Sequence, residues 1–194
     1  IDSGAMYRAV TLKWLEKSNA QKSDDDENIL DEIIKNLKIE FKDNGKIIFI
    51  NGKNSTNEIR ASVVSQNVSY VASFEVVRTA LVQKQRELSE GNNVIMDGRD
   101  IGTVVFPDAE VKIFLDASAR TRAIRRLEDL KKLGEESNLQ VLIEEIKQRD
   151  ELDSKRQIAP LIKAKDAIEI TTDNKSVLDV SQAIMLEIEK FIAA

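Results

Sequence analysis

The stretch Asp97-Gly98-Arg99-Asp100-Ile101-Gly102 constrains the fold more than any other part of this chain. It follows the apolar-rich run 93–96, and a helix is expected before that run because apolar residues recur at helical spacing over 74–88. A strand that ends in a carboxylate, a glycine and an Arg-Asp pair places opposite charges at the carboxyl end of a sheet. In open α/β sheets that edge is where ligands bind. The hexapeptide alone is equally consistent with a turn that carries a solvated ion pair.

Apolar strands and amphipathic helices alternate along the chain, which predicts an α/β fold with a doubly wound parallel sheet. After the strand at 93–96, further strands are expected over 111–116 and 167–170. The run 111–116 is nearly all apolar, which is typical of a strand buried on both faces. Only three such strands are present in full, which is few for a domain of this size.

Other segments of the chain carry local signals for helices and turns. Helices are expected over 118–133 and 138–154, and 103–108 is expected to be a loop. A capping box over 176–179 should start a last helix whose inward face is Val180, Ile184, Ile188 and Ile192. Strand-like runs at 38–42 and 46–50, each followed by an Asn-Gly turn, predict an antiparallel hairpin within a small β-rich insertion.

Composition narrows the possible functions. The 194 residues are enough for one domain with a real core. The absence of Cys and His excludes disulfides, thiolate or imidazole zinc sites and serine triads. No apolar run is long enough to cross a bilayer, and we expect a cytoplasmic protein. The net charge of −5 argues against a general nucleic-acid binder.

Arginine is concentrated in clusters, at positions 120, 122, 125 and 126 and again at 149 and 156. Its planar fork suits bidentate contact with phosphate. Arg149, Asp153 and Arg156 are four and three residues apart and so share one helix face. That pattern alone is more typical of an ion-paired surface. Because arginines next to a carboxylate or hydroxyl recur along an acidic chain, the sequence indicates a binder of small phosphorylated ligands.

The chain resembles the bacterial-type cytidylate kinases. The resemblance runs over its whole length and is carried by several motifs in the right order: Asp2–Arg8, 74–78, 97–107, 111–117 and 149–161, ending in Ile158-Ala159-Pro160-Leu161. It implies a P-loop kinase fold and transfer of the ATP γ-phosphoryl group to CMP or dCMP, with Mg²⁺. It also implies a monomer that needs neither nucleic acid nor a membrane. The whole chain, 1–194, would be one domain with a core of 1–28 and 78–194, a nucleotide-binding insertion of about 29–77 and a lid of about 118–156.

The resemblance assigns three groups of side chains to the acceptor nucleotide. The group on its phosphate is Ser3, Arg8 and Arg99, with Tyr7 lining the same pocket. The group on the cytosine edge is Ser69, Arg78 and Asp100. The group on the sugar and the phosphates as the site closes is Arg149, Asp153 and Arg156.

Catalysis is assigned to Asp97, Arg99 and Arg149, with Asp97 near Mg²⁺ either directly or through water. The arginines expected to touch the ATP phosphates are Arg122, Arg125 and Arg126, although charge on a helix surface explains these three equally well.

One feature of the family is absent from these residues. No Gly-x-x-x-x-Gly-Lys-[Ser/Thr] loop occurs, whereas the family carries one just upstream of the segment that opens here. We therefore expect the natural protein to be longer by a strand, that loop and a helix, about 30 residues. The alternative is a CMP-binding fragment without catalysis. A uridylate or adenylate kinase is a third reading, disfavoured by Ser69, Arg78 and Asp100.

Overall fold

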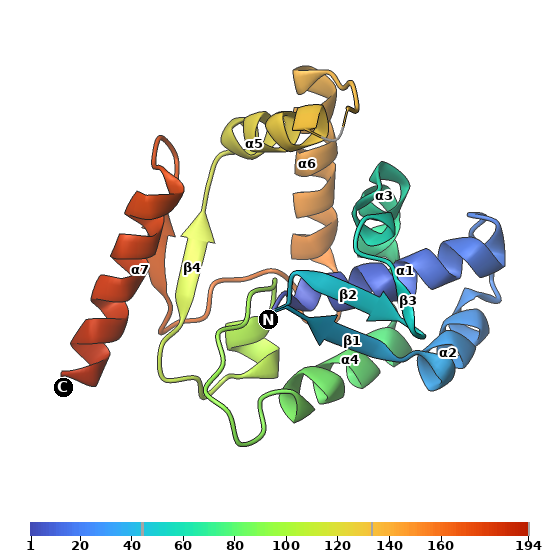
Figure 1. Ribbon diagram of the computed structural model, residues 1–194, viewed down its shortest axis with the longest axis horizontal. Helices are drawn as coiled ribbons and strands as arrows, with labels where there is room; N and C mark the ends of the chain where they lie inside the picture. Colours follow the sequence, from blue (N-terminus) through green and yellow to red (C-terminus); the bar gives the residue numbers. More distant parts are fainter. Residues whose placement is uncertain (44, 133, 194) are drawn as a thin grey trace.

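The computed structural model describes residues 1–43, 45–132 and 134–193 and contains a mixture of helices and short strands (Figure 1). The first half consists of α1 (Ser3–Ser18), α2 (Asp26–Asn36), β1 (Ile39–Lys42), β2 (Ile47–Ile50), β3 (Lys53–Asn54), the 3₁₀ turn η1 (Glu58–Arg60), α3 (Ser62–Val71) and α4 (Glu75–Glu87). The second half consists of the π-helical turn η2 (Ile101–Val105), β4 (Ile113–Asp116), α5 (Ala119–Lys132), α6 (Leu139–Lys155), β5 (Ile168–Thr171) and α7 (Val177–Ile192).

The local signals in the sequence explain where most elements begin. Asp2 caps α1 by accepting a hydrogen bond from the Ala5 amide at 3.0 Å. Asn138 caps α6 in the same way, and Ser176 and Asp179 form the predicted capping box of α7. The helices predicted over 138–154 and after the capping box are confirmed, as is the described part of the helix predicted over 118–133. The predicted end of the helix at Leu133 lies outside the described residues.

The predicted hairpin is confirmed as well. Strands β1 and β2 pair antiparallel with Ile39 opposite Ile50, and β3 adds a short third strand. The turn between β2 and β3 uses Asn51 and Gly52, both in the left-handed region with φ of 50° and 81°. The other predicted Asn-Gly turn includes Asn44, which lies outside the described residues.

Most of the apolar core lies in the first half of the chain. One cluster of buried side chains joins α1, α2, the hairpin, α3 and α4, with Trp14 and Met6 fully buried. Burial of each large apolar side chain stabilises the fold by about 1.5–3 kcal/mol, and together they hold these elements in place. The insertion predicted at about 29–77 thus shares its core with α1 and α4. A smaller cluster joins α5 to α6.

The parallel sheet is less complete than predicted. Strands β4 and β5 pair in parallel, with Ile113 opposite Ile168, and a single parallel bridge joins Asp2 to Asp97. Within the described residues no ladder connects these two pairings. The protein therefore has a three-stranded antiparallel sheet and a two-stranded parallel sheet.

Three predictions for this region were wrong. Residues 93–96 form no strand: the Ile1 amino group donates to the Ile95 carbonyl and the Asp97 amide donates to the Ile1 carbonyl, but this pairing amounts to a single bridge, Asp2–Asp97. Ile95 is 80% exposed. Strand β4 is not buried on both faces. Helix α7 lies along only one side of the β4–β5 pair (Figure 1), and Leu115 is 51% exposed. On α7 the predicted inward face is only half-buried, and Ile192 is exposed.

The predicted loop 103–108 was also wrong in its first part. Residues 101–105 form the π-helical turn η2, in which the Asp100 carbonyl accepts hydrogen bonds from the amides of Val104 and Val105 at 2.9 and 3.3 Å. The Phe106 amide closes the turn onto the Ile101 carbonyl at 2.7 Å. Such turns are rare and are frequently found at functional sites.

Candidate active site

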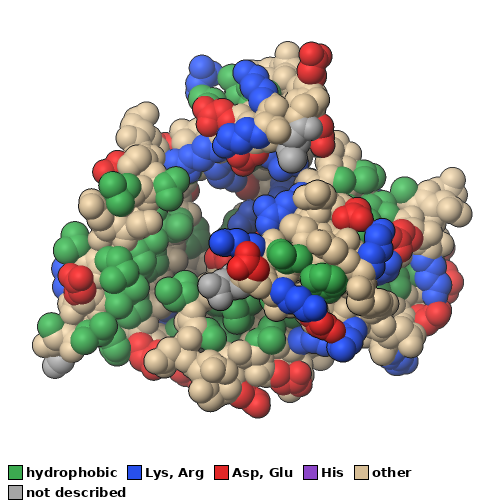
Figure 2. All heavy atoms as spheres, viewed as in Figure 1, with side chains coloured by type: hydrophobic (Ala, Val, Ile, Leu, Met, Phe, Trp, Pro, Cys, Tyr) green, Lys and Arg blue, Asp and Glu red, His purple; other side chains and the backbone are tan. Residues whose placement is uncertain are grey.

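A polar cavity of about 300 Å³ lies between the start of α1, helices α3 and α4, the segment 97–100 and helix α6. Its size is at the lower end of the range for small-ligand sites. Figure 2 shows a hollow at the centre of the molecule with Lys and Arg side chains gathered along its wall. Its charged lining comprises seven arginines, Arg8, Arg60, Arg78, Arg99, Arg126, Arg149 and Arg156, and four aspartates, Asp2, Asp97, Asp100 and Asp153.

One wall of the cavity carries a buried ion pair. The Arg78 side chain, on α4, donates from Nη2 to the Asp100 carboxylate, and both side chains are about 95% buried. A second donor, Nη1, binds the Ala72 carbonyl at 3.2 Å, and the Arg78 guanidinium carbon lies 5.4 Å from the centre of the Tyr7 ring. A buried pair held at both ends has one orientation. It therefore presents donors and an acceptor side by side.

Burial also acts on the hydroxyl of Tyr7. Desolvation raises the pKa of Tyr7, and the nearby Asp100 carboxylate adds to the rise while Arg78 and Arg156 oppose it. The Tyr7 hydroxyl therefore stays protonated and available as a donor within the cavity.

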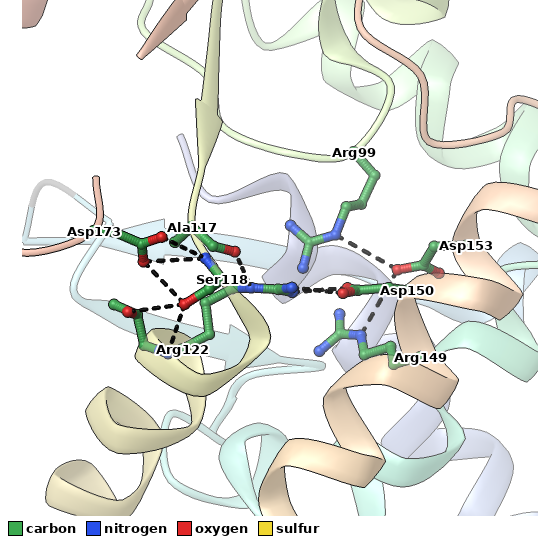
Figure 3. Close-up of polar contacts among 9 residues, drawn as sticks. Arg99, Ala117, Ser118, Arg122, Arg149, Asp150, Asp153 and Asp173 are labelled. Atoms are coloured by element: carbon green, nitrogen blue, oxygen red, sulfur yellow. Dashed lines mark hydrogen bonds and ion pairs between the residues drawn. The ribbon is translucent and has the colours of Figure 1, made fainter. Parts of the chain in front are cut away.

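Asp153, on α6, gathers four side chains from three parts of the chain: α3, the segment 97–100 and α6 with its C-cap. Its carboxylate accepts a hydrogen bond from the Ser69 hydroxyl of α3 at 2.9 Å. Three arginines surround it, with nitrogen–oxygen distances of 3.5 Å for Arg99, 3.8 Å for Arg149 and 3.9 Å for Arg156. Figure 3 shows the Arg99 and Arg149 side chains converging on Asp153 from opposite sides. One buried carboxylate therefore orients three cations.

The cations of the cavity outnumber the anions, and the ionisation of Arg8 reflects this excess. Burial, followed by the charges of Arg149 and Arg126, lowers the pKa of Arg8 to about 10. Burial and the charge of Arg99 lower the pKa of Arg149 as well. Arg8 itself donates to the Ser65 hydroxyl at 2.8 Å. A site in which buried cations repel one another favours an anionic ligand.

The segment that follows the apolar run 93–96 brings Asp97 next to the start of α1. The Ser3 hydroxyl donates to the Asp97 carbonyl at 2.6 Å. Partial desolvation of the Asp97 carboxyl, followed by repulsion from the Asp2 carboxylate, raises its pKa. Gly98 allows this close approach, because a Cβ there would overlap the Ser3 hydroxyl and lie 2.8 Å from the Ile101 side chain. The two carboxylates, Asp2 and Asp97, both line the cavity.

The three lid arginines are placed differently from one another. Arg126 lines the cavity. Arg122 instead makes a bidentate ion pair with Asp150 at 2.7 and 2.6 Å and donates to the Ala117 carbonyl (Figure 3). Arg125 donates to Thr172 at the end of β5. Arg122 and Arg125 thus lie at the carboxyl ends of β4 and β5 rather than in the cavity wall.

The structure brings all ten residues predicted for the acceptor nucleotide to this one cavity. The sequence reasoning missed Arg60, which lies at the end of η1 and whose carbonyl accepts a hydrogen bond from Arg126 at 3.4 Å. An arginine directly before a helix start was the only local signal for it.

The comparisons with known proteins agree on one family. The family model described as Cytidylate kinase matches residues 1–190 of this chain. This chain belongs to the cytidylate kinase family. The cytidylate kinase of Bacillus velezensis is 48% identical over 192 residues, which are 98% of this chain and 84% of that protein. The cytidylate kinases of Bacillus thuringiensis and of one Bacillus cereus strain are each 50% identical over 189 residues, 95% of this chain and 82% of theirs.

As a cytidylate kinase, this chain has the fold of that family, and the resemblance drawn from its motifs is confirmed. The individual roles of the site residues stay predictions. No helix in the described part of the chain has the length and apolar character to cross a membrane. The described residues also contain no group of three or more acidic, histidine or cysteine side chains suited to a metal ion.

Proposed function

We propose that this cytidylate kinase transfers the γ-phosphoryl group of ATP to CMP or dCMP, and that the arginine-rich cavity is its acceptor site. The observation that carries the proposal is the Arg78–Asp100 pair at the wall of a strongly cationic cavity. We further propose that it works as a monomer in the cytoplasm, on small nucleotides rather than nucleic acid.

The ion pair is complementary to the edge of cytosine. Cytosine offers an amino donor at N4 and acceptors at N3 and O2. Asp100 can accept from the amino group, and Arg78 can donate to N3 and O2. Uracil reverses the polarity at N3 and position 4, which would leave buried groups mispaired at about 1–3 kcal/mol each. Ser69, whose hydroxyl donates to Asp153, is the third side chain assigned to the base.

The remaining arginines suit the phosphate. Ser3, Tyr7, Arg8 and Arg99 line the same cavity, and Arg149 and Arg156 face it from α6. Phosphoryl transfer needs positioned groups and neutralised charge rather than a covalent nucleophile. A phosphate would relieve the repulsion that lowers the pKa of Arg8, so we assign Arg8 to the phosphate of the acceptor.

Mg²⁺ fits the end of the 93–97 segment. Asp2 and Asp97 stand close enough for the Asp2 carboxylate to raise the pKa of Asp97, and a divalent cation would remove that penalty. Mg²⁺ in kinases is held by one or two carboxylates together with substrate phosphates. Asp97 would hold it, directly or through water, and the ion would supply neutralisation of the phosphate charge. Arg122, Arg125 and Arg126 are the arginines that we assign to ATP.

The test is an ADP-release assay with ATP and Mg²⁺ and, in turn, CMP, dCMP, UMP and AMP, paired with calorimetric titration of each acceptor. Turnover with the cytidine nucleotides alone supports the whole proposal. Binding of CMP without turnover would retain the acceptor site and show that this chain alone does not carry out the transfer. Absence of CMP binding would overturn the assignment of the cavity.

A further inference from the structure

The carboxylate of the base-reading pair sits directly before the π-helical turn η2. The Asp100 carbonyl accepts the amides of Val104 and Val105, so the main chain of Asp100 is part of the turn. Any change in the turn therefore moves the Asp100 carboxylate relative to Arg78. A π-helical turn is a rare conformation that needs support from its surroundings.

Helix α4 supplies that support through Arg86. The guanidinium donates from Nε to the Val105 carbonyl at 3.0 Å and from Nη2 to the Val104 carbonyl at 2.8 Å. These carbonyls lie at the end of the turn, where a helical segment leaves its acceptors without internal partners. Two planar donors on two successive carbonyls fix the direction as well as the position of the turn.

Arg86 lies on the same helix as Arg78. Helix α4 thus holds the segment 100–105 at both ends, with Arg78 on the Asp100 carboxylate and Arg86 on the carbonyls of Val104 and Val105. Because both sets of hydrogen bonds come from one helix, α4 sets the spacing between the Arg78 donors and the Asp100 acceptor.

We infer that Arg86 is a positioning residue for base recognition: by clamping η2 onto α4 it fixes Asp100 against Arg78 and so sets the preference for cytosine over uracil. This rests on the proposed function of the pair. Arg86 is absent from the cavity lining, and its guanidinium bonds only the carbonyls of the turn among the described residues, so it acts through Asp100.

The test compares three variants with the wild-type protein. Arg86→Met removes both donors, and Arg86→Lys keeps the charge but not the fork. Lys84→Met is the matched control, because it removes a cation from the same helix and the Lys84 side chain makes no hydrogen bond or ion pair within the described residues. The readouts are calorimetric affinities for CMP and UMP, KM and kcat wherever the wild-type protein turns over, and the midpoint of thermal unfolding.

Arg86→Met is expected to weaken CMP binding about tenfold while weakening UMP binding much less, so that the CMP-to-UMP ratio falls. Where turnover is measured, the loss should lie in KM, with kcat within about threefold. Arg86→Lys should be intermediate and Lys84→Met unchanged. A lower unfolding midpoint with an unchanged ratio would make Arg86 merely structural and overturn the inference. A wild-type protein that binds CMP and UMP equally would overturn the proposed function, and the inference with it.

Discussion

Arg8 is surrounded by other arginines, and this decides what it can bind. Burial and the charges of Arg149 and Arg126 lower its pKa to about 10, yet it remains protonated at neutral pH. Arg8→Ala should therefore weaken CMP binding by about 1.5–3 kcal/mol, the range for hydrogen bonds to a charged group, or roughly 10- to 150-fold. Calorimetric titration measures it, with cytidine as the control ligand. An equal loss for cytidine would exclude phosphate contact.

Gly98 is required by space rather than by backbone conformation. A Cβ would overlap the Ser3 hydroxyl and crowd Ile101, so Gly98→Ala must displace Ser3 from the Asp97 carbonyl. We expect a loss of about 1–3 kcal/mol in the free energy of unfolding, together with weaker CMP binding. Urea unfolding and a CMP titration check this. Gly102→Ala is the comparison, because the nearest atom to its Cβ would be Lys112 Cδ at 3.2 Å, a contact that a shift of a few tenths of an ångström relieves. Equal stability of the two variants would contradict the steric argument.

At the scale of the elements, Asp26 ties α2 to α1 and α3. It is fully buried and accepts hydrogen bonds from the Trp14 indole at 3.0 Å, the Tyr70 hydroxyl at 2.6 Å and the Ser23 amide and hydroxyl. Burial alone would raise the pKa of Asp26, but these donors outweigh it and lower the pKa below 3.8. The carboxylate thus stabilises the fold at pH values above 3.8, the pKa of this group in the unfolded chain. This contribution is lost as the pH falls through the lower pKa of the folded protein.

Asp26→Asn should accordingly destabilise the protein by about 2–4 kcal/mol at neutral pH. Both carboxylate oxygens of Asp26 accept hydrogen bonds, and the NH₂ group of an asparagine would replace one of these acceptors with a donor that faces another donor. Its stability should also fall less than that of the wild-type protein as the pH drops below about 4. Urea unfolding across that range measures both effects. Parallel pH profiles for the two proteins would show that the Asp26 carboxylate contributes nothing to acid unfolding.

How far the sequence predicted each element depends on where its partners lie. The capping box at Ser176 and the hairpin turn at Asn51 are local and were predicted correctly. The apolar run 93–96 has strand composition, but a strand needs a neighbour, and pairing here stops at one bridge. The π-helical turn after Asp100 has no local signature, because Arg86 supports it from another element.

The same reasoning applies to the site. Family resemblance, rather than spacing, singled out Arg78 and Asp100, and only the structure shows them as a buried pair. The role of Asp153 as a carboxylate shared by three arginines could not be deduced from one helix face, since Arg99 reaches it from a different segment. Arg60 belongs to no motif and was missed.

For the molecule as a whole, the two tyrosines report on the cavity and on the apolar core in one experiment. Tyr7 lines the cavity, and Tyr70 of α3 is partly buried and packs against the core beside Trp14. The chain has no other tyrosine. Burial raises the pKa of Tyr7; burial and the hydrogen bond to Asp26 raise the pKa of Tyr70 to about 12. A raised folded pKa contributes stability below pH 10 that is lost as the pH rises toward the folded value.

The tyrosines of the native protein should therefore ionise at higher pH than those of protein unfolded in urea, which should titrate near the model value of 10.0. Ultraviolet absorbance of tyrosinate follows both curves, and Tyr7→Phe isolates the titration of Tyr70. A native titration of either tyrosine near pH 10 would contradict the burial of that side chain.

We propose that one buried pair, Arg78 and Asp100, recognises cytosine in a cavity that holds the phosphate of CMP. The most direct measurement is the affinity of the wild-type protein and of Asp100→Ala for CMP and UMP by calorimetry. We expect the wild-type protein to prefer CMP by at least about tenfold, and Asp100→Ala to lose most of this preference, mainly through weaker CMP binding. Equal losses for the two nucleotides, or a wild-type protein that binds both alike, would contradict it.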